Sequence, residues 1–333
     1  MRLFDCTLRD GANVVGNGFS KELTVSMVKA LLDCGIDQIE LGNAKGIGSY
    51  ENGAEAPLTD LGYMQAVAPF AGKGKLGMFL LASLATEERV NMAAENGLHF
   101  LRVGAAAGDG KGSLPAVKLV KAAGLYCRYS LMKAYICTPE ALAEEARLLE
   151  DAGVDSITIM DSAGTMLPEE TAAYVKAMKE KVSISVGFHG HSNLGMAQAN
   201  ALAAVDAGAE EIDCGLLGMA RSAGNCATEL AVASFQRQGM LETVDFYRLL
   251  DYLDKDLIPA MTAHGYQPAV KPLDLILGLS GCHSSFVGLF EQAAKDTGVS
   301  LYRLIVEVSK KDRKKPDAVL IRETAEALRG MKA

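Results

Sequence analysis

Two histidines follow directly on an apolar stretch in the second half of the chain. Residues 182–188 contain several β-branched and aromatic side chains and predict a buried strand that ends in His189 and His191. Because side chains alternate across a strand, residues two apart share a face. Two neutral imidazoles placed in this way are typical ligands of a divalent metal ion. The chain has only five histidines, so the pair favours a metal site over the alternative of two ordinary core or surface histidines.

The strand that carries these histidines belongs to a regular alternation of strands and helices. We predict strands at residues 2–6, 36–41, 76–81, 99–103, 125–131, 154–160, 182–188 and 210–214. Helices are predicted at residues 20–34, 60–68, 86–96, 112–123, 138–153, 168–179, 194–207 and 223–236. Such repeated strand–helix units favour a closed (β/α)8 TIM barrel in the α/β class. An open, doubly wound sheet is the alternative, but no early strand is followed by a glycine-rich phosphate-binding fingerprint.

The last part of the chain has a different pattern. Residues 244–263, 284–297, 300–310 and 317–330 show helical periodicity without intervening strands. We therefore divide the chain into a catalytic barrel, residues 1–240, and a helical C-terminal extension, residues 241–333, which we expect to pack near the barrel mouth.

Composition excludes several classes of protein. A net charge of −8 and a pI near 5.3 argue against nucleic-acid binding, and the basic residues 310–315 are expected to form a solvated turn. No apolar run reaches the length of about 18 residues that a membrane helix needs, and Asp5 comes too early for a signal peptide. Seven dispersed cysteines without a CxxC pair indicate reduced thiols. We expect a soluble, cytoplasmic protein without a nucleic-acid or membrane partner.

In a TIM barrel, the carboxyl ends of the strands form the active-site face. The barrel would bring polar side chains there from several strands, with the loop at residues 218–225 after the last one: Asp5, Arg9, Asp10, Glu40, Asp161, Ser162, His189 and His191. Asp10 is then the natural third ligand for the two histidines. Two imidazoles, one carboxylate and open positions suit Mn²⁺, the ion that we expect, with Mg²⁺, Fe²⁺ or Co²⁺ as alternatives.

Arg9 stands directly before the proposed ligand Asp10. The pair could be a structural salt bridge, but a fixed cation next to a metal ion could also stabilise a developing enolate oxygen. A metal ion and a guanidinium group together would suit a 2-oxo acid. The metal ion would chelate the carboxylate and ketone and acidify the adjacent methyl group, while Arg9 would hold the charge of the metal-bound enolate.

Two motifs resemble a known family. The sequence DCTLRDG at residues 5–11, together with HGHSNLG at residues 189–195, is similar to the metal-dependent aldolase and Claisen-condensing (HMG-CoA lyase-like) family of TIM barrels. Further stretches resemble its 4-hydroxy-2-oxovalerate aldolase branch: MDSAG at residues 160–164, GMA and AGN within residues 218–225, and GCHSSF at residues 281–286. The resemblance covers nearly the whole chain.

The resemblance implies roles for particular residues. It gives the three proposed ligands as metal ligands and Arg9 as the arginine that stabilises the enolate. Ser162 matches a residue that helps to hold the pyruvate carboxylate, and Asn225 matches a position that reaches the metal in the synthase branch. The implied reaction is the reversible cleavage of a 4-hydroxy-2-oxo acid to pyruvate and an aldehyde.

Two positions depart from the aldolase branch. Asn13 replaces a histidine that serves as acid and base near the 4-hydroxyl group, and asparagine cannot titrate. His283 replaces a tyrosine before the Ser-Ser-Phe sequence. One explanation is that His283 takes over proton transfer; others are that it is a polar lid residue or that the reaction differs. The glycine-rich loop at residues 43–53 also departs, which affects aldehyde specificity.

Two other functions stay open at this point. One is a Claisen-type synthase that joins an acyl-CoA to a 2-oxo acid. The other is an aldolase-like subunit that mainly serves an acylating aldehyde dehydrogenase, the partner that the resemblance implies. We also expect a homo-oligomer.

Overall fold

The computed structural model describes residues 1–266, 273, 277–278 and 280–330 of the chain. Its centre is a closed barrel in which eight parallel strands are paired in the order of the sequence. The strands are β1 (Arg2–Asp5), β2 (Gln38–Leu41), β3 (Lys75–Leu81), β4 (Phe100–Ala106), β5 (Tyr126–Met132), β6 (Ser156–Asp161), β7 (Ser185–Gly190) and β8 (Glu211–Cys214). Pairing of β1 with β8 closes the ring. The predicted (β/α)8 TIM barrel is confirmed.

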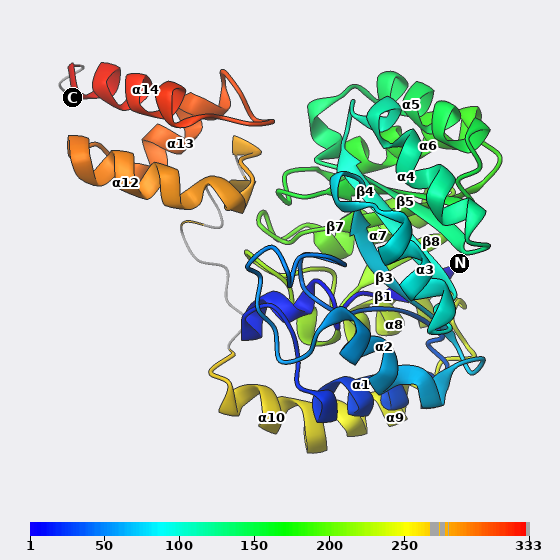
Figure 1. Ribbon diagram of the computed structural model, residues 1–333. Helices are drawn as coiled ribbons and strands as arrows, with labels where there is room; N and C mark the ends of the chain where they lie inside the picture. Colours follow the sequence, from blue (N-terminus) through cyan, green and yellow to red (C-terminus); the bar gives the residue numbers. More distant parts are fainter. Residues whose placement is uncertain (267–272, 274–276, 279, 331–333) are drawn as a thin grey trace.

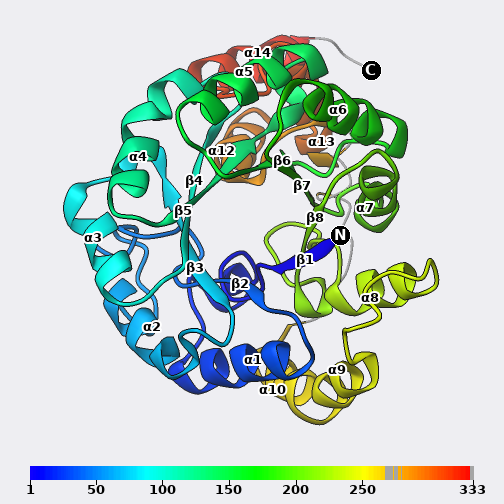
Figure 2. The ribbon, with the colours of Figure 1, turned by 90° about the vertical axis from the view of Figure 1, so that its right-hand side faces the viewer.

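Helices surround the barrel, as Figure 2 shows. They are α1 (Lys21–Asp33), α2 (Asp60–Val67), α3 (Glu87–Glu95), α4 (Gly110–Ala122), α5 (Pro139–Asp151), α6 (Pro168–Lys181), α7 (Ala197–Asp206) and α8 (Thr228–Gln236). Four of them begin after a residue whose hydroxyl group accepts a hydrogen bond from the first turn: Ser20, Thr59, Thr86 and Thr138. No helix among the described residues is both long enough and apolar enough to span a membrane.

The predicted helix at residues 223–236 begins five residues too early. In the structure α8 starts at Thr228, because the residues before it take part in isolated β-bridges. Asn225 pairs with His191, and Ala227 pairs with Gly215. Gly224 has a positive φ of 87°, which a helix does not allow. This segment therefore lies as an extended loop beside the end of β7.

A layer of aromatic and charged side chains closes the amino end of the barrel. The rings of Phe4 and Phe100 have centroids 5.4 Å apart. The guanidinium groups of Arg102 and Arg128 lie 4.4 and 4.6 Å from the Phe4 centroid. Arg128 is also paired with Glu211, at the first residue of β8. The interior is thus filled at this end, which leaves space only toward the carboxyl ends of the strands.

The chain after α8 forms two groups of helices. Helix α9 (Phe246–Tyr252), a π-helical turn (Leu253–Leu257) and α10 (Ile258–Ala263) run along the barrel, and Leu249 and Met261 belong to its hydrophobic core. Helices α12 (Val287–Thr297), α13 (Leu301–Ser309) and α14 (Ala318–Gly330) have a hydrophobic core of their own. The predicted division after residue 240 stays a prediction.

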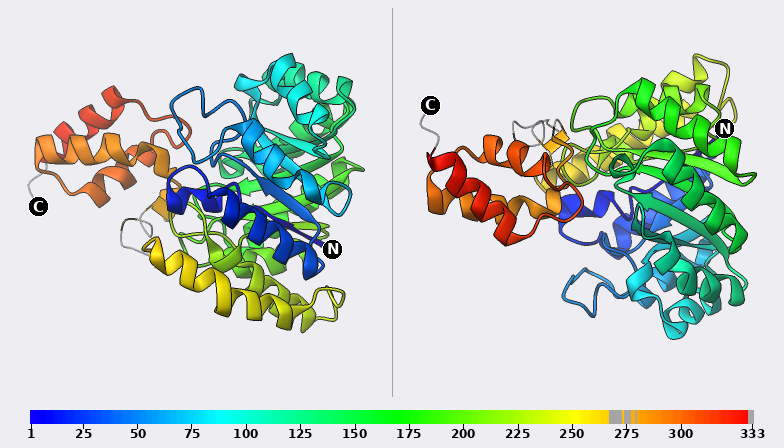
Figure 3. Two further views of the ribbon diagram at one scale, coloured as in Figure 1. Left: turned by 60° about the horizontal axis from the view of Figure 1, so that its bottom comes forward. Right: turned by 90° about the horizontal axis from the view of Figure 1, so that it is seen from above.

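Helices α12–α14 lie at the end of the barrel toward which the strands point (Figures 1 and 3). Polar contacts connect this group to the barrel. Lys314 Nζ lies 3.0 Å from Asp109 Oδ1 after β4, and Lys133 Nζ, after β5, donates to the carbonyl oxygen of Lys314 at 2.8 Å. The short 3₁₀ helix η7 (Ser284–Phe286) precedes α12, so the residues around it face the barrel mouth.

Candidate active site

The structure brings together the three residues predicted as metal ligands. Asp10 lies in the turn after β1, His189 is in β7 and His191 follows β7 directly. The Nε2 atoms of His189 and His191 lie 3.6 and 3.7 Å from Asp10 Oδ2. One ligand atom from each residue lies within 4.8 Å of the others, and all three side chains are buried. This nitrogen and oxygen donor set fits a divalent metal ion that keeps open positions for a substrate.

Asp10 is held as a carboxylate. Burial would raise its pKa, but the charges of Arg9 and Arg221 together with the nearby imidazoles hold this pKa well below its usual range. Arg9 Nη1 lies 2.9 Å from Asp10 Oδ1, and Asn225 Nδ2 donates to Asp10 Oδ2 at 2.9 Å. Asp10 can therefore serve as an anionic ligand near pH 7.

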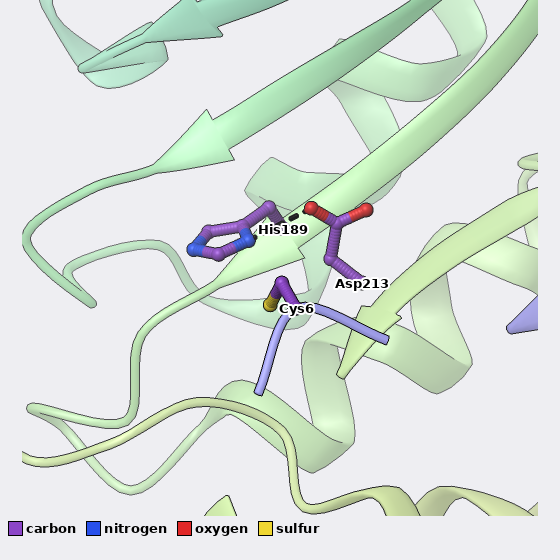
Figure 4. A group of neighbouring side chains, drawn as sticks. All are labelled: Cys6, His189 and Asp213. Atoms are coloured by element: carbon purple, nitrogen blue, oxygen red, sulfur yellow. Dashed lines mark hydrogen bonds and ion pairs between the residues drawn. The ribbon is translucent and has the colours of Figure 1, made fainter. Parts of the chain in front are cut away.

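The two imidazoles are prepared for coordination in different ways. Burial, followed by nearby positive charge, holds the pKa of His191 well below its usual value, so this ring is neutral. His189 Nδ1 lies 2.9 Å from Asp213 Oδ2, and such a contact places the proton on Nδ1 and leaves the Nε2 lone pair for a metal ion. Figure 4 shows Asp213 beside the ring of His189, with a dashed line for this contact.

Cys6 lies close to both His189 and Asp213 (Figure 4) and forms with them a second group of possible ligand atoms. Burial raises the pKa of the Cys6 thiol well above its usual value, and Sγ donates to the carbonyl oxygen of Cys214 at 3.2 Å. Asp213 already occupies Nδ1 of His189. We therefore interpret this group as support for the first one.

A ladder of buried charges fixes Arg9 and His189 relative to each other. Arg102 pairs with Asp213 and also with Glu40, at 2.6 Å between Nη2 and Oε2. Glu40 Oε2 in turn accepts from Arg9 Nε at 2.6 Å. Paired buried charges of this kind are rigid, because moving one of them leaves its partner as a buried charge without compensation. Sequence patterns did not single out Arg102 or Asp213, although each alternates with apolar residues inside a predicted strand.

Two of the three guanidinium nitrogens of Arg9 pair with described carboxylates, and the third does not. Its Nε and Nη1 atoms bind Glu40 and Asp10, so Arg9 does form the salt bridge that was considered as an alternative to a role at an enolate. Nη2 is buried and has no hydrogen-bond partner among the residues that the structure describes. The side chain lies over the ring of Phe79, 5.1 Å from its centroid. A buried guanidinium N–H without an acceptor lowers the stability of the fold, unless a bound anion accepts its hydrogen bond.

These side chains line a cavity of about 280 Å³ at the barrel mouth. Its cationic groups are those of Arg9, Lys45, Lys133 and Arg221. Its polar wall also contains Asp10, His189, His191, Ser162, His283 and Ser285, and its apolar wall is formed by Ala44, Phe79, Leu81, Met132 and Met160. A cavity of this size suits a small organic acid.

The remaining predicted site residues lie in different positions. Ser162 lines the cavity, and its Oγ accepts from the backbone N–H of Lys133 at 2.9 Å. Asn225 binds Asp10, and its buried Oδ1 has no partner in the described part of the chain. Asn13 also binds Asp10, through the carbonyl oxygen at 2.8 Å and through Oδ1 at 3.3 Å. Neither asparagine is part of the cavity wall, so both reach it only through Asp10.

His283 lies in the cavity wall just before η7 and is 8% exposed. Its Nδ1 is 2.8 Å from Ser285 Oγ, and its Nε2 is 3.4 Å from Arg221 Nη1. Burial, helped by the charges of Arg221 and Lys133, lowers the pKa of His283 to about 3. The ring is therefore neutral near pH 7.

The sequence reasoning missed Arg221 and the two lysines of the cavity. Arg221 lies in the predicted mouth loop and approaches Asp10 Oδ1 at 3.4 Å, so its place after β8 could have indicated it. Lys133 directly follows β5 and Lys45 follows β2, positions that the barrel rule assigns to the mouth. No sequence motif distinguishes these two lysines from the other lysines of the chain.

The chain was compared with known proteins. A family model described as HMGL-like matches residues 1–255. The chain belongs to the HMGL-like family. A 4-hydroxy-2-oxovalerate aldolase of Moorella thermoacetica is 36% identical over 93% of this chain and 91% of its own. An oxaloacetate decarboxylase of Mycobacterium tuberculosis is 34% identical over 92% of this chain and 90% of its own.

One solved structure supports the fold of this HMGL-like protein. The carboxyl transferase domain of Rhizobium etli pyruvate carboxylase, with pyruvate and biocytin, superposes with a TM-score of 0.78 at 15% identity. The match covers 99% of this chain and 60% of that longer chain. Together with the curated relatives, the family assignment identifies this HMGL-like protein as an enzyme, a carbon–carbon lyase that acts on small molecules.

Proposed function

We propose that this lyase is a divalent-metal-dependent aldolase that cleaves, or forms, a 4-hydroxy-2-oxo acid from pyruvate and an aldehyde. The observation that carries the proposal is the placement of Arg9 Nη2, buried and unsatisfied, beside the group of Asp10, His189 and His191. A divalent ion, for which we propose Mn²⁺, would be held by these three residues, with Mg²⁺ or Co²⁺ as alternatives. When bound, it would supply Lewis acidity that polarises the 2-oxo group.

The residues of the chain then perform the other tasks. Arg9 Nη2 donates to the oxygen that becomes negative in the pyruvate enolate, where a preorganised charge has its greatest effect. Ser162 has a hydroxyl proton to donate to the pyruvate carboxylate, because its oxygen already accepts from Lys133 N–H. Asn225 and Asn13 keep Asp10 oriented.

We assign the proton transfer to His283. As the C3–C4 bond breaks, the 4-hydroxyl proton moves to the imidazole of His283, and the electron pair of the bond forms the enolate. His283 then returns a proton to C3, which gives pyruvate, and the aldehyde leaves. Asn13 cannot perform this step, since an amide does not titrate.

The experiment for this function is a pyruvate-release screen over 4-hydroxy-2-oxo acids with tails of different length and charge. We expect turnover of at least one of them, nearly complete loss of activity in EDTA, and recovery when Mn²⁺ is added back. Pyruvate release that is indifferent to chelation would contradict the proposal. Consumption of an acyl-CoA with release of free thiol would instead indicate a Claisen-type synthase.

Replacing His283 by glutamine is expected to lower kcat by about 10²-fold, the usual range for a lost general base, while the affinity for Mn²⁺ stays within about threefold. His264→Gln, an exposed histidine at the end of α10, is the matched control. An unchanged kcat in H283Q would return His283 to the role of a polar lid residue.

The lowered pKa of His283 also predicts how stability depends on pH. Between about pH 6.5 and pH 3 the unfolded histidine binds a proton that the folded ring refuses, so the free energy of unfolding falls as the pH is lowered through this window. From pH 7 to pH 5 the wild type should lose about 2 kcal/mol more than H283Q, as measured by urea denaturation. Equal losses would mean that His283 titrates normally.

Decarboxylation of oxaloacetate is a second candidate. A curated relative carries that name, and the reaction needs the same enolate stabilisation without removal of a 4-hydroxyl proton. The presence of Asn13 next to Asp10 favours it, because no titratable group stands there. Release of CO₂ and pyruvate from oxaloacetate, faster than from any 4-hydroxy-2-oxo acid, would select this function.

We further propose a cytoplasmic location, a homo-oligomer and an acylating aldehyde dehydrogenase as partner. Co-purification with such a dehydrogenase, in the absence of turnover by this chain alone, would indicate a subunit that mainly serves its partner. The charged groups around Asp10 argue for catalysis, since the packing of a barrel does not require them.

A further inference from the structure

The cavity wall contains four cationic side chains, and two of them form no ion pair with a described carboxylate. Arg9 and Arg221 both lie within ion-pair distance of Asp10. Within the part of the chain that the structure describes, neither Lys45 nor Lys133 forms an ion pair with a carboxylate. Lys45 follows β2 and Lys133 follows β5, so the two come from different sides of the barrel and face one space.

Lys133 lies in the cavity wall with a strained backbone. Its backbone has φ 57° and ψ 42°, a left-handed conformation that is unfavourable for a residue with a side chain. The residue is half-buried. Its ammonium group has three protons to donate, and the acceptor that the structure provides is the carbonyl oxygen of Lys314, with the ring of Phe286 5.3 Å away. Burial and the charge of Lys314 lower its pKa, although the charges of Asp312 and Asp109 act in the opposite direction.

The pyruvate half of the substrate does not need these lysines. Under the proposed function, Arg9, Ser162 and the group around Asp10 already serve the 2-oxo acid. Lys45 and Lys133 therefore remain for the other half, which leaves as the aldehyde. Strained, partly desolvated groups of this kind persist where a ligand uses them.

We infer that the aldehyde half of the substrate carries a carboxylate, which Lys133 and Lys45 bind. This inference rests on the proposed function and names its substrate class: 4-hydroxy-2-oxo acids with a second carboxylate, which are cleaved to pyruvate and an oxo acid. The apolar side chains of Leu81 and Met132 would contact the carbon chain between the two charged ends.

Binding of unreactive analogues tests this inference without any turnover. In the presence of Mn²⁺, the Kd values of 2-oxoglutarate and 2-oxoadipate are measured by calorimetry against those of 2-oxopentanoate and 2-oxohexanoate, in which a methyl group replaces the far carboxylate. We expect at least one dicarboxylate to bind about tenfold more tightly than its methyl-ended analogue. Equal affinities for both pairs would overturn the inference.

Variants show which groups recognise the far carboxylate. Lys133→Gln is expected to reduce the preference for the dicarboxylate to about threefold or less, and Lys45→Gln to reduce it by a smaller factor, because that side chain is exposed. The affinity for the methyl-ended acid should not change. If K133Q weakens both acids equally, Lys133 binds the carboxylate that they share and the inference is wrong.

Two control variants separate recognition from structure. Lys314→Ala removes the ion pair with Asp109 that connects the extension to the barrel, and Lys118→Gln removes an exposed charge on α4. Both should keep the wild-type preference, and loss of the preference in K314A would make Lys133 a structural contact. Pyruvate release from a substrate with a neutral tail, without any preference in binding, would keep the aldolase and remove this inference. A preference in binding without pyruvate release would do the opposite.

Discussion

Replacing Asp10 by asparagine is expected to weaken Mn²⁺ binding by at least about 10²-fold and to lower kcat/KM for pyruvate release by at least about 10³-fold. The amide has nearly the shape of the carboxylate but lacks the charge that the metal ion needs. The change also leaves Arg9 and Arg221 facing each other without the anion between them. Metal binding is measured by the paramagnetic resonance signal of free Mn²⁺, and activity by coupled detection of pyruvate.

Asp60→Asn is the matched control. Asp60 is also a buried carboxyl group, and burial raises its pKa to about 6. Its Oδ2 accepts from Gly48 N–H at 2.7 Å, while Oδ1 has no partner, so an amide fits there. D60N should bind Mn²⁺ as the wild type does. If D10N retains wild-type affinity, the metal group has been placed on the wrong residues.

Replacing Arg9 by lysine should lower kcat by about 10²- to 10³-fold, as when a single oxyanion donor is lost, while the affinity for Mn²⁺ stays within about threefold. Lysine keeps the positive charge beside Asp10 and Glu40, and Arg102 continues to pair with Glu40, so the fold is preserved. What is lost is the nitrogen that remains after the other two have bound their carboxylates.

A conservative arginine-to-lysine change in β1 serves as the reference for R9K. Arg2 is half exposed and pairs with Glu211 at 3.0 Å, so Arg2→Lys should leave kcat unchanged. The ratio of pyruvate release to Mn²⁺ affinity then isolates the effect of the guanidinium group. A kcat within about threefold of wild type in R9K would show that Arg9 is only a structural ion pair.

The parts of this structure that follow from periodicity could be predicted from the sequence. Strands and helices alternate regularly, and parallel strands with such connections close into a barrel whose carboxyl ends meet. That rule predicted that Asp10 and the two histidines meet at the barrel mouth although about 180 residues separate them, and the structure has Asp10 within 4 Å of each histidine. The spacing of the two histidines supplied the rest.

Other parts depend on contacts that one segment cannot reveal. Residues 223–227 look helical, but bridges to residues 191 and 215 hold them extended. Arg102 and Asp213 read as isolated charges within apolar strands, and only the closed barrel makes them partners. Lys133 is held at the cavity by its left-handed backbone and by its hydrogen bond to Lys314 of the extension. The local sequence encodes neither feature.

The buried ladder described above is electrically neutral before anything binds. In the ladder, Arg9 and Arg102 are matched by Glu40 and Asp213, and beside it the partly exposed Arg221 faces Asp10. A divalent ion would therefore add two positive charges beside this ladder, and a 2-oxo acid would bring the negative charge that opposes them. Each should raise the affinity for the other by the same factor, so the ion and the substrate load this enzyme cooperatively.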